Sequence, residues 1–157
     1  MVRKATDADI DGILDLLDPY VKKDIVLPRT REDIREHLPL FLVAVEQNLV
    51  AGVVSYYRYS DSLMEIRSLA VREAYFGQGI GSMLVSGIIA KLRGENPAAK
   101  IFALTLAPEF FAKRGFEIVR SDSLPEKIWK DCSKCIKLNC CDEIPMVYQG
   151  GTDGASL

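Results

Sequence analysis

The spacing of apolar residues alternates between a helical and a strand-like period, which predicts a mixed α/β protein. Between positions 10 and 17, apolar residues recur every three or four positions, as on the buried face of a helix. Thr6 and Asp9 resemble a capping box at the start of this helix, and Asp18-Pro19 predicts its end. Thr30 is a second N-cap, so a short helix is expected behind it.

Strand-like runs follow in the middle of the chain. Phe41–Glu46 and Leu49–Tyr59 are separated only by Gln47-Asn48, a spacing typical of a tight hairpin. Leu63–Val71 adds a third strand after a short turn. The same patterns predict further strands at Val2–Ala5, Lys100–Thr105, Phe116–Arg120 and Pro145–Tyr148, and helices at Ile80–Gly94, Pro108–Lys113 and Leu124–Asp131.

Length and composition fit one globular domain. The chain has 157 residues, of which 48% are hydrophobic and 27% charged. We expect this domain to span residues 1–149. Residues 150–157 are small or polar and lack apolar anchors until the last position, so we expect a flexible tail there.

Charge and hydropathy argue against two classes of partner. The 20 basic residues are balanced by 22 acidic ones, whereas nucleic-acid binding needs a concentrated positive surface. The longest apolar runs contain proline or glycine and are too short to cross a bilayer, and the N-terminus has no apolar signal core. We therefore expect a soluble, cytoplasmic protein that binds neither nucleic acid nor membranes.

The four cysteines are clustered rather than spread along the chain. Cys132, Cys135, Cys140 and Cys141 fall within a ten-residue segment, which cannot tie distant segments together as a secreted disulfide framework does. A zinc site usually needs a second, separated pair of ligands. Free or buried thiols are the favoured interpretation, with a metal site and a redox-labile disulfide as alternatives.

A glycine cluster, Gly77-Gln-Gly-Ile-Gly81, stands between a predicted strand and a predicted helix. Such a turn presents unpaired backbone N–H groups at the positive end of a helix, which suits a pyrophosphate. The lysine of the P-loop is missing, and the glycines are not in the dinucleotide-binding order. A plain loop at the start of a helix is the alternative.

The residues around this turn resemble the GNAT superfamily of N-acetyltransferases. Leu69-Ala-Val71 followed by Phe76-Gly-Gln-Gly-Ile-Gly81 is similar to its acetyl-CoA motif, and Pro108–Phe116 is similar to its second motif. The resemblance covers roughly residues 1–148. It implies the acyl-CoA N-acyltransferase fold, with a mixed central sheet of about six to seven strands flanked by helices, and acetyl-CoA as cosubstrate.

The resemblance also implies which residues bind the cofactor. Backbone amides from Gly77 to Ser82 would hold the pyrophosphate, and the strand at Leu69 and Val71 would run along the pantetheine. Two positions depart from the family: Phe76 replaces a Gln or Arg, and Phe111 replaces a Tyr that often protonates the leaving thiolate. The implied cofactor residues are Leu69, Ala70, Val71, Phe76, Gly77, Gln78, Gly79, Ile80, Gly81, Ser82 and Phe111.

A narrower resemblance is to the acetyltransferase domain of N-acetylglutamate synthase, in a short stand-alone form. It rests on Leu27–Glu32, Glu65–Val71, Leu104-Thr105, Glu109–Phe111 and Leu124–Lys127, and on Phe111, since that family commonly has Phe there. It implies acetyl transfer to the α-amine of L-glutamate by direct attack in a ternary complex, the first step of arginine biosynthesis. We do not expect the amino-acid-kinase domain of many such enzymes in a chain of this length.

Glutamate carries two carboxylates, which arginines bind well. Arg29, Arg31 and Arg67 are the candidate substrate-binding cations, with solvated or ion-paired side chains as the alternative for each. Thr105 either bonds the substrate or caps its strand.

Glu65 is the candidate general base. It shares a strand face with Arg67, however, and a cation so close favours the ionised, weakly basic carboxylate. An ion pair that orients Arg67, and water relayed by backbone carbonyls, are alternatives. His37, the only histidine, is interpreted as a surface or packing residue.

Two other functions stay open. The same fold could acetylate another amino acid, a small amine or a protein N-terminus. The phenylalanines at positions 76 and 111 would also be compatible with a non-catalytic acyl-CoA sensor. The apolar strand near the C-terminus could pair across a homodimer.

Overall fold

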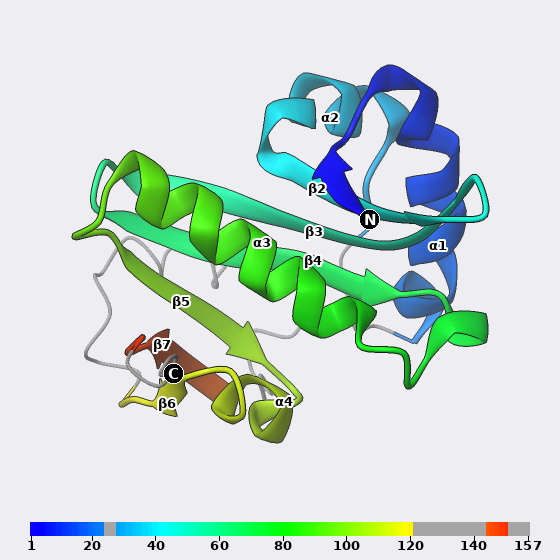
Figure 1. Ribbon diagram of the computed structural model, residues 1–157. Helices are drawn as coiled ribbons and strands as arrows, with labels where there is room; N and C mark the ends of the chain where they lie inside the picture. The colour runs from blue at the N-terminus through cyan, green and yellow to red at the C-terminus, as the bar shows by residue number, and fades with distance from the viewer. Residues whose placement is uncertain (24–27, 121–143, 151–157) are drawn as a thin grey trace. The chain divides into compact units, whose positions relative to one another are not determined.

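A computed structural model describes residues 1–23, 28–120 and 144–150 (Figure 1). These residues belong to two compact units, Met1–Ile101 and a second that begins at Phe102. The predicted helix at Leu124–Asp131, the cysteine cluster and positions 151–157 of the predicted tail lie outside the described residues. A single domain over residues 1–149 stays a prediction.

The first unit is built on an antiparallel sheet in which the strands follow one another in chain order. The predicted hairpin between the second and third strands is present. Gln47 and Asn48 have φ of 51° and 63°, and a two-residue turn with both residues left-handed matches the twist of the flanking strands. The strands are β1 (Val2–Lys4), β2 (Phe41–Glu46), β3 (Leu49–Ser60) and β4 (Leu63–Val71).

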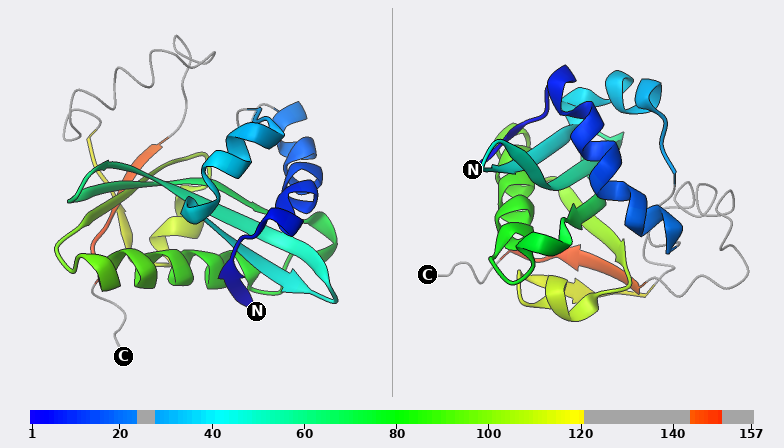
Figure 2. Two further views of the ribbon diagram at one scale, coloured as in Figure 1. Left: turned by 90° about the horizontal axis from the view of Figure 1, so that it is seen from above. Right: turned by 90° about the vertical axis from the view of Figure 1, so that its right-hand side faces the viewer.

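Helices cover both faces of this sheet. Figure 2 shows α1 (Ile10–Lys22) on one face and α3 (Ile80–Glu95) on the other. Because both faces are covered, β3 is buried continuously from Val50 to Tyr56 instead of alternating between buried and exposed positions. The remaining helical segments of this unit are α2 (Arg31–Glu36), η1 (Asp7–Asp9), η2 (Leu38–Leu40) and η3 (Glu73–Tyr75).

The prediction that Asp18-Pro19 ends the first helix is wrong, because α1 continues through Pro19 to Lys22. A proline inside a helix removes one backbone donor, but this turn is held from outside the helix. The Tyr20 hydroxyl donates to the carbonyl oxygen of Val71, at the end of β4, at 2.6 Å. Burial raises the pKa of Tyr20, so the phenol stays protonated and able to donate.

The predicted capping box precedes α1. The Asp9 carboxylate accepts the backbone N–H of Thr6 at 2.7 Å and two hydrogen bonds from the Arg3 guanidinium, at 2.7 and 3.0 Å. The hydrogen bonds from Arg3 hold the pKa of Asp9 below its ordinary value, although burial alone would raise it. Asp9 therefore fixes both the start of the helix and the nearby β1.

Replacing Asp9→Asn should lower the free energy of unfolding by about 1–2 kcal/mol at pH 7, because charge-assisted hydrogen bonds are lost. The pKa of Asp9 is lower in the folded than in the unfolded chain. Its contribution is therefore complete above the unfolded pKa and is lost as pH falls through the folded pKa. Urea unfolding of both proteins from neutral to acidic pH should show the difference shrinking. A difference that stays constant would contradict this account.

Among its described residues, the second unit contains one helix, two whole strands and the part of a third strand, β5 (Lys100–Thr105), from Phe102 onward. β7 (Ile144–Tyr148) pairs antiparallel with β5 on one side and β6 (Phe116–Ile118) on the other, and α4 (Pro108–Ala112) lies between β5 and β6 in sequence. Its core includes the buried Phe102, Phe111, Phe116 and Met146. The expected mixed α/β fold is thus confirmed. Among the described residues, no helix is long and apolar enough to cross a membrane.

Candidate active site

A glycine-rich turn follows β4 and opens α3. After β4 ends at Val71, η3 leads to Gly77 and Gly79, whose φ angles are 81° and 79°. Residues with a side chain rarely adopt this conformation, so glycine suits both positions. Gly79 is the N-cap of α3, a helix of 16 residues. The turn therefore brings to the surface the first N–H groups of a long helix, which have no partner within that helix.

This turn has the properties of an anion site. A Cβ at Gly77 or Gly79 would meet nothing within 4 Å, so both positions face open space. The first turn of α3 carries no acidic residue, and the helix dipole adds positive potential there. Phe76 beside the turn is 57% exposed, which leaves its ring open to contact. The geometry and charge fit a diphosphate group.

The other cofactor residues expected from the sequence follow a path along β4 and into α3. Ala70 and Ile80 have buried side chains, so only their backbone could contact a ligand. The others are partly or fully exposed: Leu69, Gln78, Gly81 and Ser82.

β4 is irregular before it reaches the turn. Ser55 of β3 pairs with Arg67 and Val53 pairs with Ala70, so β4 has one residue more than β3 between these pairs. Ser68 in this stretch has a φ of 53°, in the left-handed region. This is a β-bulge, which bends the strand and takes the backbone of Ser68 and Leu69 out of regular pairing.

Glu65 and Arg67 lie on the same face of β4, as strand alternation predicts. Arg67 Nε donates to Glu65 Oε1 at 2.7 Å, and Arg67 Nη2 donates to the hydroxyl of Tyr59 at 2.8 Å. The Tyr59 hydroxyl donates in turn to Glu65 Oε1 at 3.1 Å, and the Tyr57 ring lies 4.4 Å from the Arg67 guanidinium. Burial lowers the pKa of Arg67, but the charge of Glu65 and these hydrogen bonds outweigh it and raise the pKa. Glu65 thus orients a permanently charged Arg67.

Arg29 approaches from the segment before α2. Its Nε donates to Asp33 Oδ2 at 2.7 Å, and its Nη1 donates to Ser68 Oγ at 3.2 Å. The guanidinium also lies 5.0 Å from the centre of the Phe41 ring. Through Ser68, Arg29 is therefore attached to the bulge of β4.

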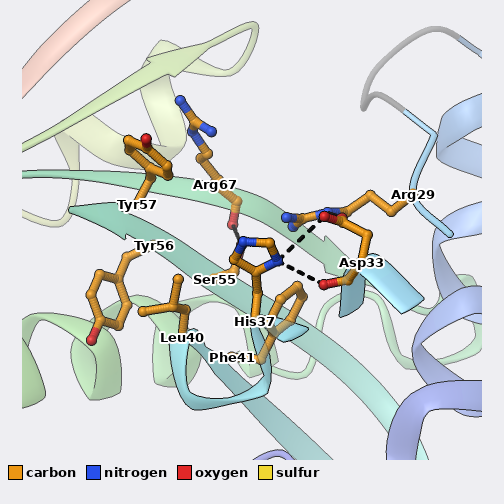
Figure 3. A pocket seen from close by; sticks show the side chains of 9 residues that line it. All are labelled: Arg29, Asp33, His37, Leu40, Phe41, Ser55, Tyr56, Tyr57 and Arg67. Carbon is orange, nitrogen blue, oxygen red and sulfur yellow. Dashed lines mark hydrogen bonds and ion pairs between the residues drawn. The ribbon is translucent and has the colours of Figure 1, made fainter. Parts of the chain in front are cut away.

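Arg29 and Arg67 line one pocket of about 220 Å³ within the first unit (Figure 3). Arg67 stands four residues before Val71, or about 13 Å along a strand, and η3 then leads from the end of β4 to the glycine turn. The other residues that line the pocket are Asp33, His37, Leu40, Phe41, Ser55, Tyr56 and Tyr57.

The interpretation of His37 as a surface or packing residue missed its place in this pocket. The His37 side chain is 37% exposed, and Nδ1 lies 2.7 Å from the carbonyl oxygen of Asp33 and 3.3 Å from Asp33 Oδ1. The sequence did contain a signal. Asp33 and His37 are four residues apart, a spacing that brings side chains together along a helix.

Three other candidate site residues have local partners. Arg31 forms an ion pair with Asp11 and is not among the residues that line the pocket. Thr105 is buried, and its Oγ1 accepts the backbone N–H of Ala107 at 2.8 Å, which is the strand-capping alternative. Phe111 is 5% exposed within an aromatic cluster of the second unit. Their roles in binding stay predictions.

Comparison with known proteins gives the family. Residues 10–116 match the profile described as the Acetyltransferase (GNAT) family. A protein of Chlorobaculum tepidum named as an uncharacterized N-acetyltransferase is 40% identical over 146 residues, which cover 93% of this chain and 94% of that protein. The chain belongs to the GNAT family of acetyltransferases. It is therefore an N-acetyltransferase that uses acetyl-CoA as cosubstrate.

Within this family the chain is similar to amino-acid acetyltransferases. That of Pectobacterium carotovorum is 34% identical over 80% of this chain, which spans only 29% of that enzyme. Among solved structures, N-acetylglutamate synthase from Neisseria gonorrhoeae, complexed with coenzyme A and N-acetyl-glutamate, has a TM-score of 0.85 and 30% identity, covering 94% of this chain and 34% of that one. Rv2747 from Mycobacterium tuberculosis, in a complex that contains CoA, has a TM-score of 0.80 and 26% identity, with coverage of 94% and 98%.

Proposed function

We propose that this protein transfers the acetyl group of acetyl-CoA to the α-amine of L-glutamate, in the cytoplasm and as the first step of arginine biosynthesis. The observation that carries the proposal is the pair of guanidinium groups, Arg29 and Arg67, in one pocket. Glutamate presents two carboxylates, and arginine forms the strongest planar hydrogen bonds to such groups. The likeness to N-acetylglutamate synthase supports the same acceptor.

Arg29 and Arg67 are held ready for such a ligand. Asp33 and Ser68 engage Nε and Nη1 of Arg29, and its Nη2 donates no hydrogen bond to the described residues. Arg67 is fixed by Glu65 and Tyr59. Side chains held in place before binding lose less conformational entropy when the ligand arrives, which improves affinity.

The glycine turn would hold the diphosphate of the cosubstrate through backbone N–H groups at the start of α3, between Gly77 and Ser82. The Val71 end of β4 is fixed by the Tyr20 hydroxyl, and the bulge at Ser68 leaves backbone groups of β4 outside the sheet ladder. These groups would align the pantetheine and the thioester carbonyl. Acetyl-CoA supplies the activated acetyl group and a thiolate leaving group.

The amine must attack as the free base, directly on the thioester. Phe111 cannot donate a proton to the departing sulfur. A thiol with an ordinary pKa near 8.5 leaves adequately as a thiolate, so this position does not prevent catalysis.

The test is release of CoA thiol from acetyl-CoA in the presence of single amino acids, small amines and peptides. We expect glutamate to give the highest kcat/KM and glutamine, which lacks the second carboxylate, to be much poorer. Turnover that is higher with another acceptor would overturn the choice of glutamate. Tight acetyl-CoA binding without turnover on any acceptor would indicate a sensor instead of an enzyme.

A further inference from the structure

The His37 ring is held in one tautomer by its contact with Asp33. Nδ1 lies 2.7 Å from the main-chain carbonyl oxygen of Asp33. A carbonyl oxygen can only accept a hydrogen bond, so Nδ1 must carry the proton. The Asp33 carboxylate, 3.3 Å away, favours the same arrangement. In the neutral ring the lone pair is therefore on Nε2.

That second nitrogen is placed toward the pocket. In Figure 3, the ring edge opposite the Asp33 contacts faces the side where Ser55 and Arg67 lie. His37 lines the same pocket as the two guanidinium groups, and its side chain is 37% exposed, so water can reach it. A neutral imidazole in this position is a proton acceptor beside the site where an amino acid would be held.

We propose that His37 is a catalytic residue, the general base that takes a proton from the ammonium group of the acceptor through Nε2, with Asp33 as its positioning residue. This inference rests on the proposed amino-acid acetyltransferase function. The ammonium gives one proton to Nε2, from which it passes to water. The free amine then forms the C–N bond, the C–S bond breaks, and a second proton from the nitrogen ends on the thiolate. One amide, one thiol and one released proton balance the reaction.

Glu65, the base expected from the sequence, is less well placed for this task. Glu65 is a buried residue that is not among those lining the pocket, and its carboxylate accepts hydrogen bonds from Arg67 and Tyr59. A carboxylate held in this way by a guanidinium is a weak base. The structure instead gives Glu65 an orienting role, whereas His37 lines the pocket and carries a ring nitrogen that can accept a proton.

The electrostatic surroundings of His37 come from three elements. Asp33 of α2 and Arg29 before it lie on one side, and Asp33 contacts both Arg29 and His37. Arg67 of β4 and the phenols of Tyr56 and Tyr57 of β3 complete the titratable groups that line the pocket. His37 therefore has one carboxylate and two guanidinium groups around it in the pocket.

The first test uses the fact that the chain has a single histidine. In the ¹⁵N-labelled protein, long-range imidazole correlations should show Nδ1 protonated and Nε2 unprotonated in the neutral state, without assignment ambiguity. Addition of glutamate should change the Nε2 signal more than the Nδ1 signal. A neutral ring protonated on Nε2 would overturn the proposal.

The second test is kinetic. His37→Gln should lower kcat at least about 100-fold, the usual contribution of a general base. The Kd of acetyl-CoA should stay within about twofold of the wild-type value, because His37 does not bind the cosubstrate in this proposal. In the wild type, the decline of kcat toward acidic pH should follow the protonation of His37 seen by NMR. In His37→Gln, this decline should disappear. Added imidazole should restore part of the activity of His37→Ala. Glu36→Gln, at the exposed last residue of α2 and next to His37, is the matched control.

The outcomes separate the two proposals. If wild type prefers an amine other than glutamate, the acceptor is wrong and the His37 variants are assayed with that amine. If His37→Gln keeps the wild-type kcat and acidic decline, His37 is not the base, whatever the acceptor. A folded wild type that turns over no amine would overturn both proposals.

Discussion

Replacing Arg67→Ala should raise the KM for glutamate about 10- to 100-fold, because a hydrogen bond between charged groups contributes roughly 1.5–3 kcal/mol. The Kd of acetyl-CoA should stay close to that of wild type, since Arg67 lies in the pocket about 13 Å along β4 from the end that enters the glycine turn. Steady-state kinetics with each substrate varied, together with calorimetry of CoA binding, measure both quantities.

Two further substitutions control this experiment. Arg67→Lys keeps the charge but loses the planar fork, so its KM should lie between those of wild type and Arg67→Ala. Arg31→Ala removes an exposed arginine that is paired with Asp11 and does not line the pocket, so it should leave the KM nearly unchanged. Loss of CoA binding in Arg67→Ala, or an equal effect of Arg31→Ala, would show that the acceptor site is elsewhere.

The substitution Gly79→Ala should affect the other substrate. Whereas Arg67→Ala is expected to raise the KM for glutamate, Gly79→Ala should raise the KM for acetyl-CoA about tenfold or more. A left-handed φ of 79° costs a residue with a side chain roughly 1–2 kcal/mol. The turn must either carry this strain or rotate its N–H groups away from the diphosphate. The new Cβ would also project into the open space where the diphosphate is expected. The KM for glutamate should change little.

Gly94→Ala, near the other end of α3, is the matched control. Its added Cβ also meets nothing within 4 Å, but its φ is not in the left-handed region. It should leave both KM values unchanged and stabilise the protein by up to about 1 kcal/mol, because alanine loses less backbone entropy than glycine in a helix. If both variants bind acetyl-CoA like wild type, the turn does not hold the diphosphate.

Local signals in the sequence were sufficient for most of the fold. The hairpin at Gln47-Asn48, the third strand at Leu63–Val71 and the cap at Thr30 depend on neighbours within a few residues, and they were predicted at or near their observed positions. Pro19 is different. It lies within α1, and the next residue, Tyr20, is held by a hydrogen bond to Val71, 51 residues away, which no local pattern reveals.

The site was less predictable because it is assembled from separate segments. Arg29 and Arg67 were both singled out, but only the fold shows that they share a pocket and that Arg31, two residues from Arg29, does not line it. The same spacing of four that joins Asp33 to His37 was visible in the sequence. Whether this pair would face the pocket or the solvent depended on the orientation of α2, which is set by packing against the rest of the fold.

The left-handed serine in β4 links the stability of that strand to the position of an arginine that lines the pocket. Ser68 has a backbone conformation that glycine would adopt with less strain, yet its hydroxyl accepts a hydrogen bond from Arg29. Exchange for glycine would relax the strand and remove one hydrogen bond of Arg29, while the bond from Arg29 to Asp33 would stay. Under the proposed function, this variant should unfold at a higher temperature than wild type but bind glutamate more weakly, so the Ser68 hydroxyl exchanges stability for binding.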